Sequence, residues 1–245
     1  MGVVRNLALA LMLQGDRLTN PASGFAGQWR LGDSVGTYAD SVRPALRINL
    51  IAAQIPTTPV FVQEQEAPIS SNPKVGDIIG FGRYEQDNNL SNGAEEIEWR
   101  ILAIEGNTAL IVSVMGLDAK PYHEPGGYIT WEDSTLRSWL NNEFYNASFS
   151  EEERAKIKRT RVVNEDNPYH GTEGGNDTKD HVFLLSVAEA GRYFGGDEDR
   201  QLKPTKYAIA NGAWADSDNG NAYWWLRSPG FDQGLAAEIN SVGSI

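Results

Sequence analysis

The chain has 245 residues, enough for one large domain or two modest ones built around an apolar core. Its 21 basic and 33 acidic residues give a formal charge of -12, which argues against nucleic acid and anionic membrane surfaces as partners. The absence of cysteine excludes disulfides, thiolate nucleophiles and cysteine-ligated zinc.

An apolar run near the start, residues 7–13 (LALALML), is too short to span a membrane. Only Arg5 precedes the run, and the Gln-Gly-Asp that follows it is a poor cleavage context for a secretion signal. A buried strand or short helix is therefore favoured over a signal peptide, and no membrane insertion is expected.

Two segments of the chain share a pattern. Residues 24–38 (GFAGQWRLGDSVGTY) can be aligned with residues 234–245 (GLAAEINSVGSI), and both copies contain Ser-Val-Gly near their ends. The first copy continues into residues 41–50 (SVRPALRINL), whereas the second copy has no such continuation. We therefore interpret residues 1–50 as a tail-like segment carrying a closing strand. Residues 51–74, rich in Pro, Gln and Glu, are predicted to be an extended linker.

The main domain is predicted over residues 75–245. Within it, Ser134 and Ser150 are positioned to cap helices, and the acids of the second helix precede its bases as the helix dipole favours. The predicted strands cover residues 77–84, 96–104, 108–114 and 181–186, and the predicted helical segments cover residues 132–144, 151–160 and 187–194. Residues 205–211 are amphipathic. Short strands, two or three short helices and long polar loops predict an α+β fold.

The C-terminal stretch begins with two adjacent tryptophans, Trp224 and Trp225. In a strand, successive side chains point to opposite faces, so one tryptophan is expected in a core and the other under whatever covers the second face. Pro229 and Gly230 form a turn signal, after which the alternation of residues 235, 237 and 239 predicts a second strand.

Five stretches resemble a family of uncharacterised bacterial domains common in gut bacteria. They are FGRY (81–84), IEWRILAIEGNTALIVS (97–113), TWEDSTLRSWLNNEFYNASFSEEE (130–153), NDTKDHVFLLSVAEAGRYF (176–194) and WWLRSPG (224–230). That family is related to the C-type-lectin-like fold of the variable proteins of diversity-generating retroelements and of the formylglycine-generating enzymes. The resemblance covers about two thirds of the chain and implies a C-type-lectin-like fold with short twisted antiparallel sheets. Formylglycine-generating activity depends on cysteines and is not implied, because this chain has none.

Members of that family usually end in a strand containing Val-Arg-Pro-Ala-Leu, which in this chain lies at residues 42–46. This departure implies either a window cut from a tandem array or, in effect, a circular permutant in which residues 24–50 supply the closing strand. We predict that residues 41–50 pair with the tryptophan-containing sheet, either within the chain or in a neighbouring copy, since a missing strand leaves an edge ready to pair.

The resemblance also implies ligand recognition on loops near the tryptophan strand. Aromatic, Asn and Asp side chains supply rigid contact area and adaptable hydrogen bonds. The alternative is that the tryptophans are core residues, that Arg227 pairs with a buried carboxylate or carbonyl, and that the loops are ordinary solvated loops. The candidate ligand-binding residues are Trp214, Asp216, Asp218, Asn219, Asn221, Tyr223, Trp225, Arg227, Phe231, Asp232 and Gln233.

The sequence contains no recognised catalytic or metal motif. His123, His170 and His181 are far apart in the chain, and no pair of carboxylates is distinguished by its position. Residues 216–220 have an oxygen-rich spacing suited to calcium, and residues 197–199 and 164–167 are further polar clusters, but each is also typical of a solvated loop. No cofactor is therefore predicted, with calcium as the alternative.

These patterns together predict a non-enzymatic, lectin-like domain that binds a protein or glycan. We expect it on a bacterial cell surface or a virion, with a cytoplasmic location left open. One alternative is a structural module of a tandem or polymeric assembly, self-associating through residues 41–50. A second alternative is a carboxylate-dependent hydrolase. Acids close together in a cleft would favour the hydrolase, and a strand crossing between chains would favour the assembly module.

Overall fold

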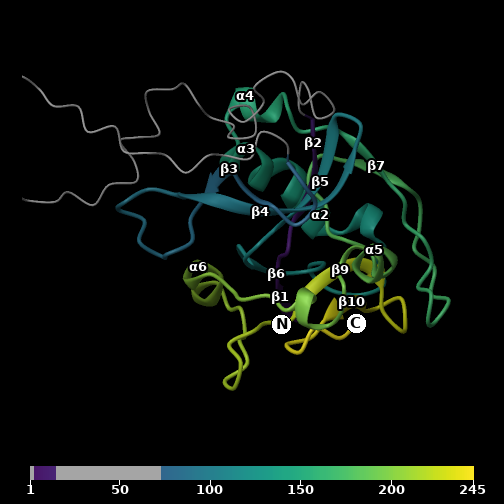
Figure 1. Cartoon of the computed structure of the whole chain (residues 1–245). Coiled ribbons are helices and arrows are strands. Elements are labelled where there is room, and N and C mark those ends of the chain that lie inside the picture. Colours follow the sequence, from purple (N-terminus) through teal and green to yellow (C-terminus); the bar gives the residue numbers. More distant parts are fainter. Residues whose placement is uncertain (1–2, 15–72) are drawn as a thin grey trace, which may run out of the picture.

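The computed structural model describes residues 3–14 and 73–245 and combines strands in small sheets with short helices (Figure 1). The predicted α+β class is therefore confirmed, whereas the likeness to C-type lectins stays a prediction. Across the described residues, no helix is both long enough and apolar enough to cross a membrane. The predicted pairing of residues 41–50 and nearly all of the predicted linker lie outside the described residues.

The described strands form two four-stranded sheets and a short pair. The strands are β1 (Val4–Asn6), β2 (Ala10–Gln14), β3 (Ile78–Tyr84), β4 (Glu95–Glu105), β5 (Thr108–Ser113), β6 (Ala119–Pro121), β7 (Thr160–Val162), β8 (Thr178–Asp180), β9 (Trp224–Pro229) and β10 (Ala236–Ile239). The first sheet has the order β10-β9-β1-β6, the second has the order β2-β5-β4-β3, and β7 pairs with β8.

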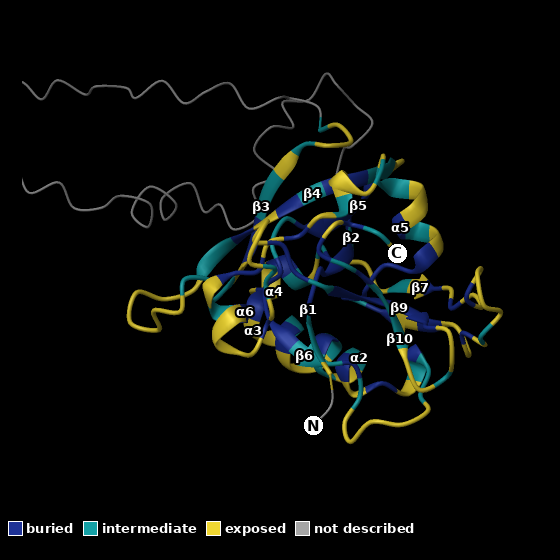
Figure 2. Ribbon diagram, turned by 90° about the horizontal axis from the view of Figure 1, so that it is seen from below, coloured by how far each residue is buried: buried dark blue, intermediate teal, exposed yellow. Residues whose placement is uncertain are grey.

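The helices are all short. They are α2 (Thr135–Trp139), continued by a π-helical turn over Leu140–Phe144 and by α3 (Tyr145–Ser148), then α4 (Glu151–Arg154), α5 (Val187–Tyr193) and α6 (Lys206–Ala210), with 3₁₀ turns at Trp131–Asp133 and Glu198–Arg200. Figure 2 shows that the buried residues concentrate in the strands and the exposed residues in the connecting loops.

The N-terminal strands hold the two sheets together. β1 lies between β9 and β6, and β2 then pairs in antiparallel register with β5, from Ala10 opposite Val112 to Gln14 opposite Thr108. The leucines at alternate positions, Leu7, Leu9, Leu11 and Leu13, are completely buried. The predicted buried strand near the start of the chain is thus confirmed, and the folded unit includes residues 3–14 as well as the predicted domain.

Local sequence signals place several other elements correctly. β4 and β5 form the predicted hairpin, with Gly106 in the left-handed region at φ 60°. Ser134 and Ser150 cap their helices as predicted, because each hydroxyl accepts the backbone N–H three residues later, and Ser150 belongs to a complete capping box.

Two predicted elements are changed by contacts with distant residues. The helix predicted over residues 151–160 ends at Arg154, because Lys156 O accepts from Gln14 N and Lys158 N donates to Met12 O. This pairing draws the chain alongside β2. The strand predicted over residues 181–186 is reduced to a single bridge between Phe183 and Ala10.

Replacement of Leu9 by Ala tests whether the N-terminal strand belongs to the core. Leu9 is fully buried, so we expect Leu9→Ala to lower the free energy of unfolding by about 2–5 kcal/mol in urea denaturation. Leu90→Ala is the matched control, because Leu90 is 78% exposed and its truncation should change stability by less than about 0.5 kcal/mol. Equal unfolding midpoints for the two variants would contradict the buried position of Leu9.

Candidate functional site

Strand β9 is the element around which the candidate site is built. Its two tryptophans are buried and contact different neighbours: Trp224 lies against Phe194, and Trp225 lies against Tyr122 at 5.8 Å between ring centroids. The indole N–H of Trp225 donates to Lys120 O, and the Tyr122 hydroxyl donates to Arg227 O. The ring of Trp225 is therefore held firmly from the side of β6.

Arg227 is an internal anchor rather than a surface contact, which corrects the prediction that it reaches a ligand. Its guanidinium donates to both carboxylate oxygens of Glu189 and to the backbone oxygens of Leu184 and Val163. Glu189 in turn accepts the backbone N–H of Ser186 as part of a capping box. Arg227 thereby fastens β9 to the start of α5, as the alternative interpretation expected.

Two adjoining hollows lie on the Trp225 side of β9. The first, of about 350 Å³, is lined by residues that include Tyr122, His123, Gly127 and Gln233, and we call it the His123 hollow. The second, of about 320 Å³, is lined by residues that include Tyr169, His170, Phe231 and Glu238, and we call it the His170 hollow. Both hollows are also lined by Val3, Trp225, Leu235 and Ala236. They therefore form one continuous face, which we call the Trp225 face.

The side chains that line the Trp225 face carry no net formal charge when both histidines are neutral, although the chain carries a charge of -12. No Asp, Glu, Lys or Arg lines the His123 hollow. In the His170 hollow the charged lining residues are Arg5 and Glu238, which pair at 2.6 Å between Nε and a carboxylate oxygen. Arg5 also lies over the Trp225 ring, 5.7 Å from its centroid. The acids that give the chain its charge therefore lie elsewhere.

Exposed aromatic residues border the Trp225 face. Phe231 is 66% exposed and Tyr169 is 70% exposed, and both line the His170 hollow. Tyr128, also exposed, lies beside Gly234 at the His123 hollow. Asp232 accepts the Gly234 N–H and thus holds the turn between β9 and β10.

The structure divides the predicted ligand-binding residues into two groups. Trp225, Phe231 and Gln233 line the hollows, and Asp232 supports the turn between them. The remaining residues, Trp214, Asp216, Asp218, Asn219, Asn221, Tyr223 and Arg227, line neither hollow. Sequence reasoning missed Tyr169, His170 and Tyr128, which come from distant loops. The signal for these residues in the sequence was the adjacent pair of ring side chains, Tyr169 and His170, inside the polar loop of residues 164–180.

The loop before β9 is held by its own hydrogen bonds. Asp216 accepts the backbone N–H groups of Asp218 and Asn219 and the hydroxyl of Ser241. The N–H of Asp218 is the main cause that holds the pKa of the Asp216 carboxyl below its usual range. Asn221 is buried and donates to Ser241 O, which corrects its prediction as an exposed contact. The oxygen-rich spacing of residues 216–220 is therefore accounted for by hydrogen bonds that close the loop.

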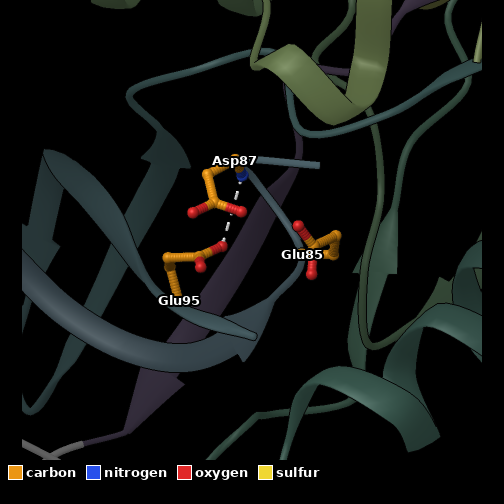
Figure 3. Close-up of side chains that lie close together, drawn as sticks. All are labelled: Glu85, Asp87 and Glu95. Atoms are coloured by element: carbon orange, nitrogen blue, oxygen red, sulfur yellow. Dashed lines mark hydrogen bonds between the residues drawn. The ribbon is translucent and has the colours of Figure 1, made fainter. Parts of the chain in front are cut away.

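A different group of acids is close enough together to hold a cation. Glu85, Asp87 and Glu95 each offer a carboxylate oxygen, and these oxygens lie within 4.8 Å of one another (Figure 3). Their oxygens also accept hydrogen bonds from the β3–β4 loop: Glu95 accepts the N–H groups of Gln86 and Asp87, and Asp87 accepts from Asn92. The Asn92 side chain is the main cause that lowers the pKa of Asp87. None of the three acids lines either hollow.

The three histidines are separate in space as well as in sequence. His123 lines one hollow and accepts the Thr135 N–H at Nδ1, whereas His170 lines the other hollow and contacts the Phe231 ring. His181 stacks on Tyr145 at 4.5 Å, and burial lowers its pKa. They therefore form no joint metal or acid–base site.

The model of a family described as a domain of unknown function, DUF6273, matches residues 106–245, which is more than half of the chain. The chain belongs to this family. The match contains β9, β10 and the hollow-lining residues other than Val3 and Arg5. Searches of curated proteins and of solved structures gave no match.

Removal of Arg227 tests its role as an internal anchor. Arg227→Met leaves the oxygens of Leu184 and Val163 without their donor, so we expect a loss of about 3–5 kcal/mol in the free energy of unfolding. Arg192→Met, at an exposed position on α5, is expected to cost less than about 1 kcal/mol. A mild effect of Arg227→Met, equal to that of the control, would show that the guanidinium is not an anchor.

Acid titration tests the role of Asp216. Its folded pKa is lowered, so its stabilising contribution is complete above the unfolded value of about 3.9 and is lost as the pH falls through the lower folded value. Asp216→Ala should therefore lower the urea midpoint near neutral pH, and the difference from the native chain should shrink below about pH 4. Asp216→Asn keeps one acceptor oxygen and should fall between the two. A difference that is independent of pH would rule out the carboxylate as the cause.

Proposed function

We propose that this chain is a non-enzymatic binding domain that holds an uncharged part of a protein or glycan on the Trp225 face. The observation that carries the proposal is the pair of adjoining neutral hollows bordered by exposed aromatic rings. Hollows of this size match ordinary ligand sites, in which mainly apolar walls are combined with a few polar groups.

The construction of the face supports a binding role. Trp225 is fixed by its hydrogen bond to Lys120 and by the Tyr122 ring, so the floor loses little freedom when a ligand binds. The border comes from loops, where Phe231 and Tyr169 expose large aromatic areas at low entropic cost. A rigid floor with aromatic loops around it is the arrangement expected of a recognition surface.

The hydrolase alternative has less support. Catalysis by a carboxylate pair needs two acids facing one substrate site. The His123 hollow has no carboxylate in its lining, and Glu238 of the His170 hollow is engaged by Arg5. Glu85 and Asp87 of the β3–β4 loop lie close to Glu95 at the start of β4, but none of the three acids lines either hollow. A C-type-lectin-like fold displayed on a bacterial or virion surface would suit the proposed binding role and is part of the proposal.

Binding to defined probes tests this function. The full chain is applied to immobilised neutral and acidic oligosaccharides and to a displayed library of random peptides. We expect an uncharged probe to bind, with an affinity that changes little between low and high salt, since no ion pair is formed. Phe231→Ala combined with Tyr169→Ala should weaken binding at least about tenfold, because both rings border the same hollow.

Trp214→Ala is the matched control for that experiment. Trp214 is an exposed aromatic residue that lies against Tyr223 and lines neither hollow, so its removal should leave binding unchanged. Circular dichroism confirms that each variant remains folded. Preference for an acidic probe, or an equal loss with Trp214→Ala, would contradict the assignment of binding to the Trp225 face.

A further inference from the structure

Residues 4–14 occupy a groove that is walled on both sides by the rest of the domain. On one side Asn6 N donates to Tyr223 O, and on the other Leu7 N donates to Asp118 O. Further along, Ala10 and Phe183 exchange backbone hydrogen bonds, and Ser113 N donates to Leu9 O. The segment therefore has partners along its whole length, as an inner strand has.

All of these partners are distant in the sequence. The strand that pairs with β2 begins at Thr108, 94 positions after Gln14, and residues 15–72 separate the segment from the next described element. None of the contacts depends on the strand and the groove belonging to the same chain. The same segment of a second copy would make the same hydrogen bonds and bury the same leucines.

We propose that this groove is an interface between copies of the chain, in which residues 4–14 of one copy complete the domain of another. Exchange of an identical element replaces every contact by an equal one, so its cost is low and depends mainly on concentration. Dilute chains close on themselves because their own strand has the higher effective concentration. Exchanged copies accumulate as the chain concentration rises.

Residues 42–50 (VRPALRINL) offer a competing sequence within the same chain, and the groove selects against it. With Leu46 at the position of Leu7, Arg47 and Asn49 would replace Ala8 and Ala10, which are both fully buried. Ala8 lines a hollow of about 20 Å³ together with Arg100 and Arg200. That space is too small for a guanidinium, and its charged lining residues, Arg100, Arg200 and Asp199, already carry a net positive charge. We therefore assign the exchanged strand to residues 4–14.

Exchange has a consequence for the binding site, and this step alone rests on the proposed function. Val3 directly precedes the exchanged segment and Arg5 belongs to it. Both residues line the His170 hollow. In an exchanged pair, each Trp225 face would be completed by residues of the partner copy. Assembly and ligand binding would then share the same strand.

Complementation between two defective full-length chains tests the exchange. Leu9→Asp breaks the strand and leaves the groove intact, whereas the double variant Ile101→Asp/Ile111→Asp breaks the groove wall and leaves the strand intact. Each should be unfolded alone, because a charge is forced into the core. The Leu9→Asp chain is labelled with ¹⁵N, mixed with the unlabelled double variant in urea and refolded. We expect dispersed, native amide signals from the labelled chain in the mixture only.

Two further mixtures identify the donor. If the unlabelled chain also carries Leu9→Asp, the rescue should disappear, since neither chain then has an intact strand. If it carries Ile48→Asp instead, the rescue should persist. Rescue that is abolished by Ile48→Asp would overturn the assignment to residues 4–14 in favour of residues 42–50. Absence of rescue, or native signals from the Leu9→Asp chain alone, would overturn the proposal itself.

Refolding of the native chain gives a readout that does not depend on defective variants. Light scattering after chromatography should find a dimer or larger species whose share rises in proportion to the chain concentration during refolding. Because the strand is released only when the domain opens, this species should persist after dilution. A share that does not vary with refolding concentration contradicts exchange. Ligand binding enters none of these measurements, so failure of the proposed function would leave their outcome unchanged.

Discussion

Burial of one strand between two sheets is the constraint on which the rest of this structure depends. The leucines at alternate positions of residues 7–13 and the alanines between them are all buried. The backbone of Val4–Asn6 joins β9 and β6 in one sheet, and that of Ala10–Gln14 joins β5 in the other. The hydrophobic gain of an alternating apolar strand is obtained only when both faces are covered, so the two sheets must come together around it. The Trp225 face therefore owes its position to a segment that lies outside the continuous domain of residues 73–245.

A second constraint fixes the floor of the candidate site. Arg227 draws β9 onto the start of α5 through Glu189, and Tyr122 joins β9 to the other side of the sheet through Arg227 O. Trp225 lies two residues before Arg227 on the same strand, so the anchor of one side chain sets the depth of the other. At the border of the face, buried Asn167 ties the backbone of the Tyr169 loop to Pro229 O, whereas the rings of Phe231 and Tyr169 themselves are exposed. The floor of the site is thus held rigid through Arg227, whereas the adaptable contacts come from the exposed rings of Phe231 and Tyr169.

The sequence predicted elements whose causes are local. Ser134 and Ser150 cap helices through their own hydroxyls, and the β4–β5 hairpin follows from alternation on either side of a glycine turn. The sequence did not predict the elements whose structure depends on contacts between distant residues. Residues 156–158 have the composition of a helix end but pair with β2 instead. In the site, Phe231 and Gln233 were found because they follow the tryptophan strand directly, whereas Tyr169 and His170 reach the same hollow from a loop some sixty residues earlier. The periodicity of a single sequence does not show that two loops so far apart in the chain line the same hollow.

The neutrality of the Trp225 face can be understood from the strand that completes it. Arg5 enters the face with β1 and meets Glu238 on β10, across the intervening β9. Without the N-terminal strand, Glu238 would remain as an unpaired acid beside an apolar hollow, in a chain already rich in negative charge. The same segment therefore supplies the leucines that close the core and the cation that balances the face. Since these two roles reside in one short strand, a ligand that needs a neutral surface can bind only a domain whose strand is in place, whichever copy of the chain provides it.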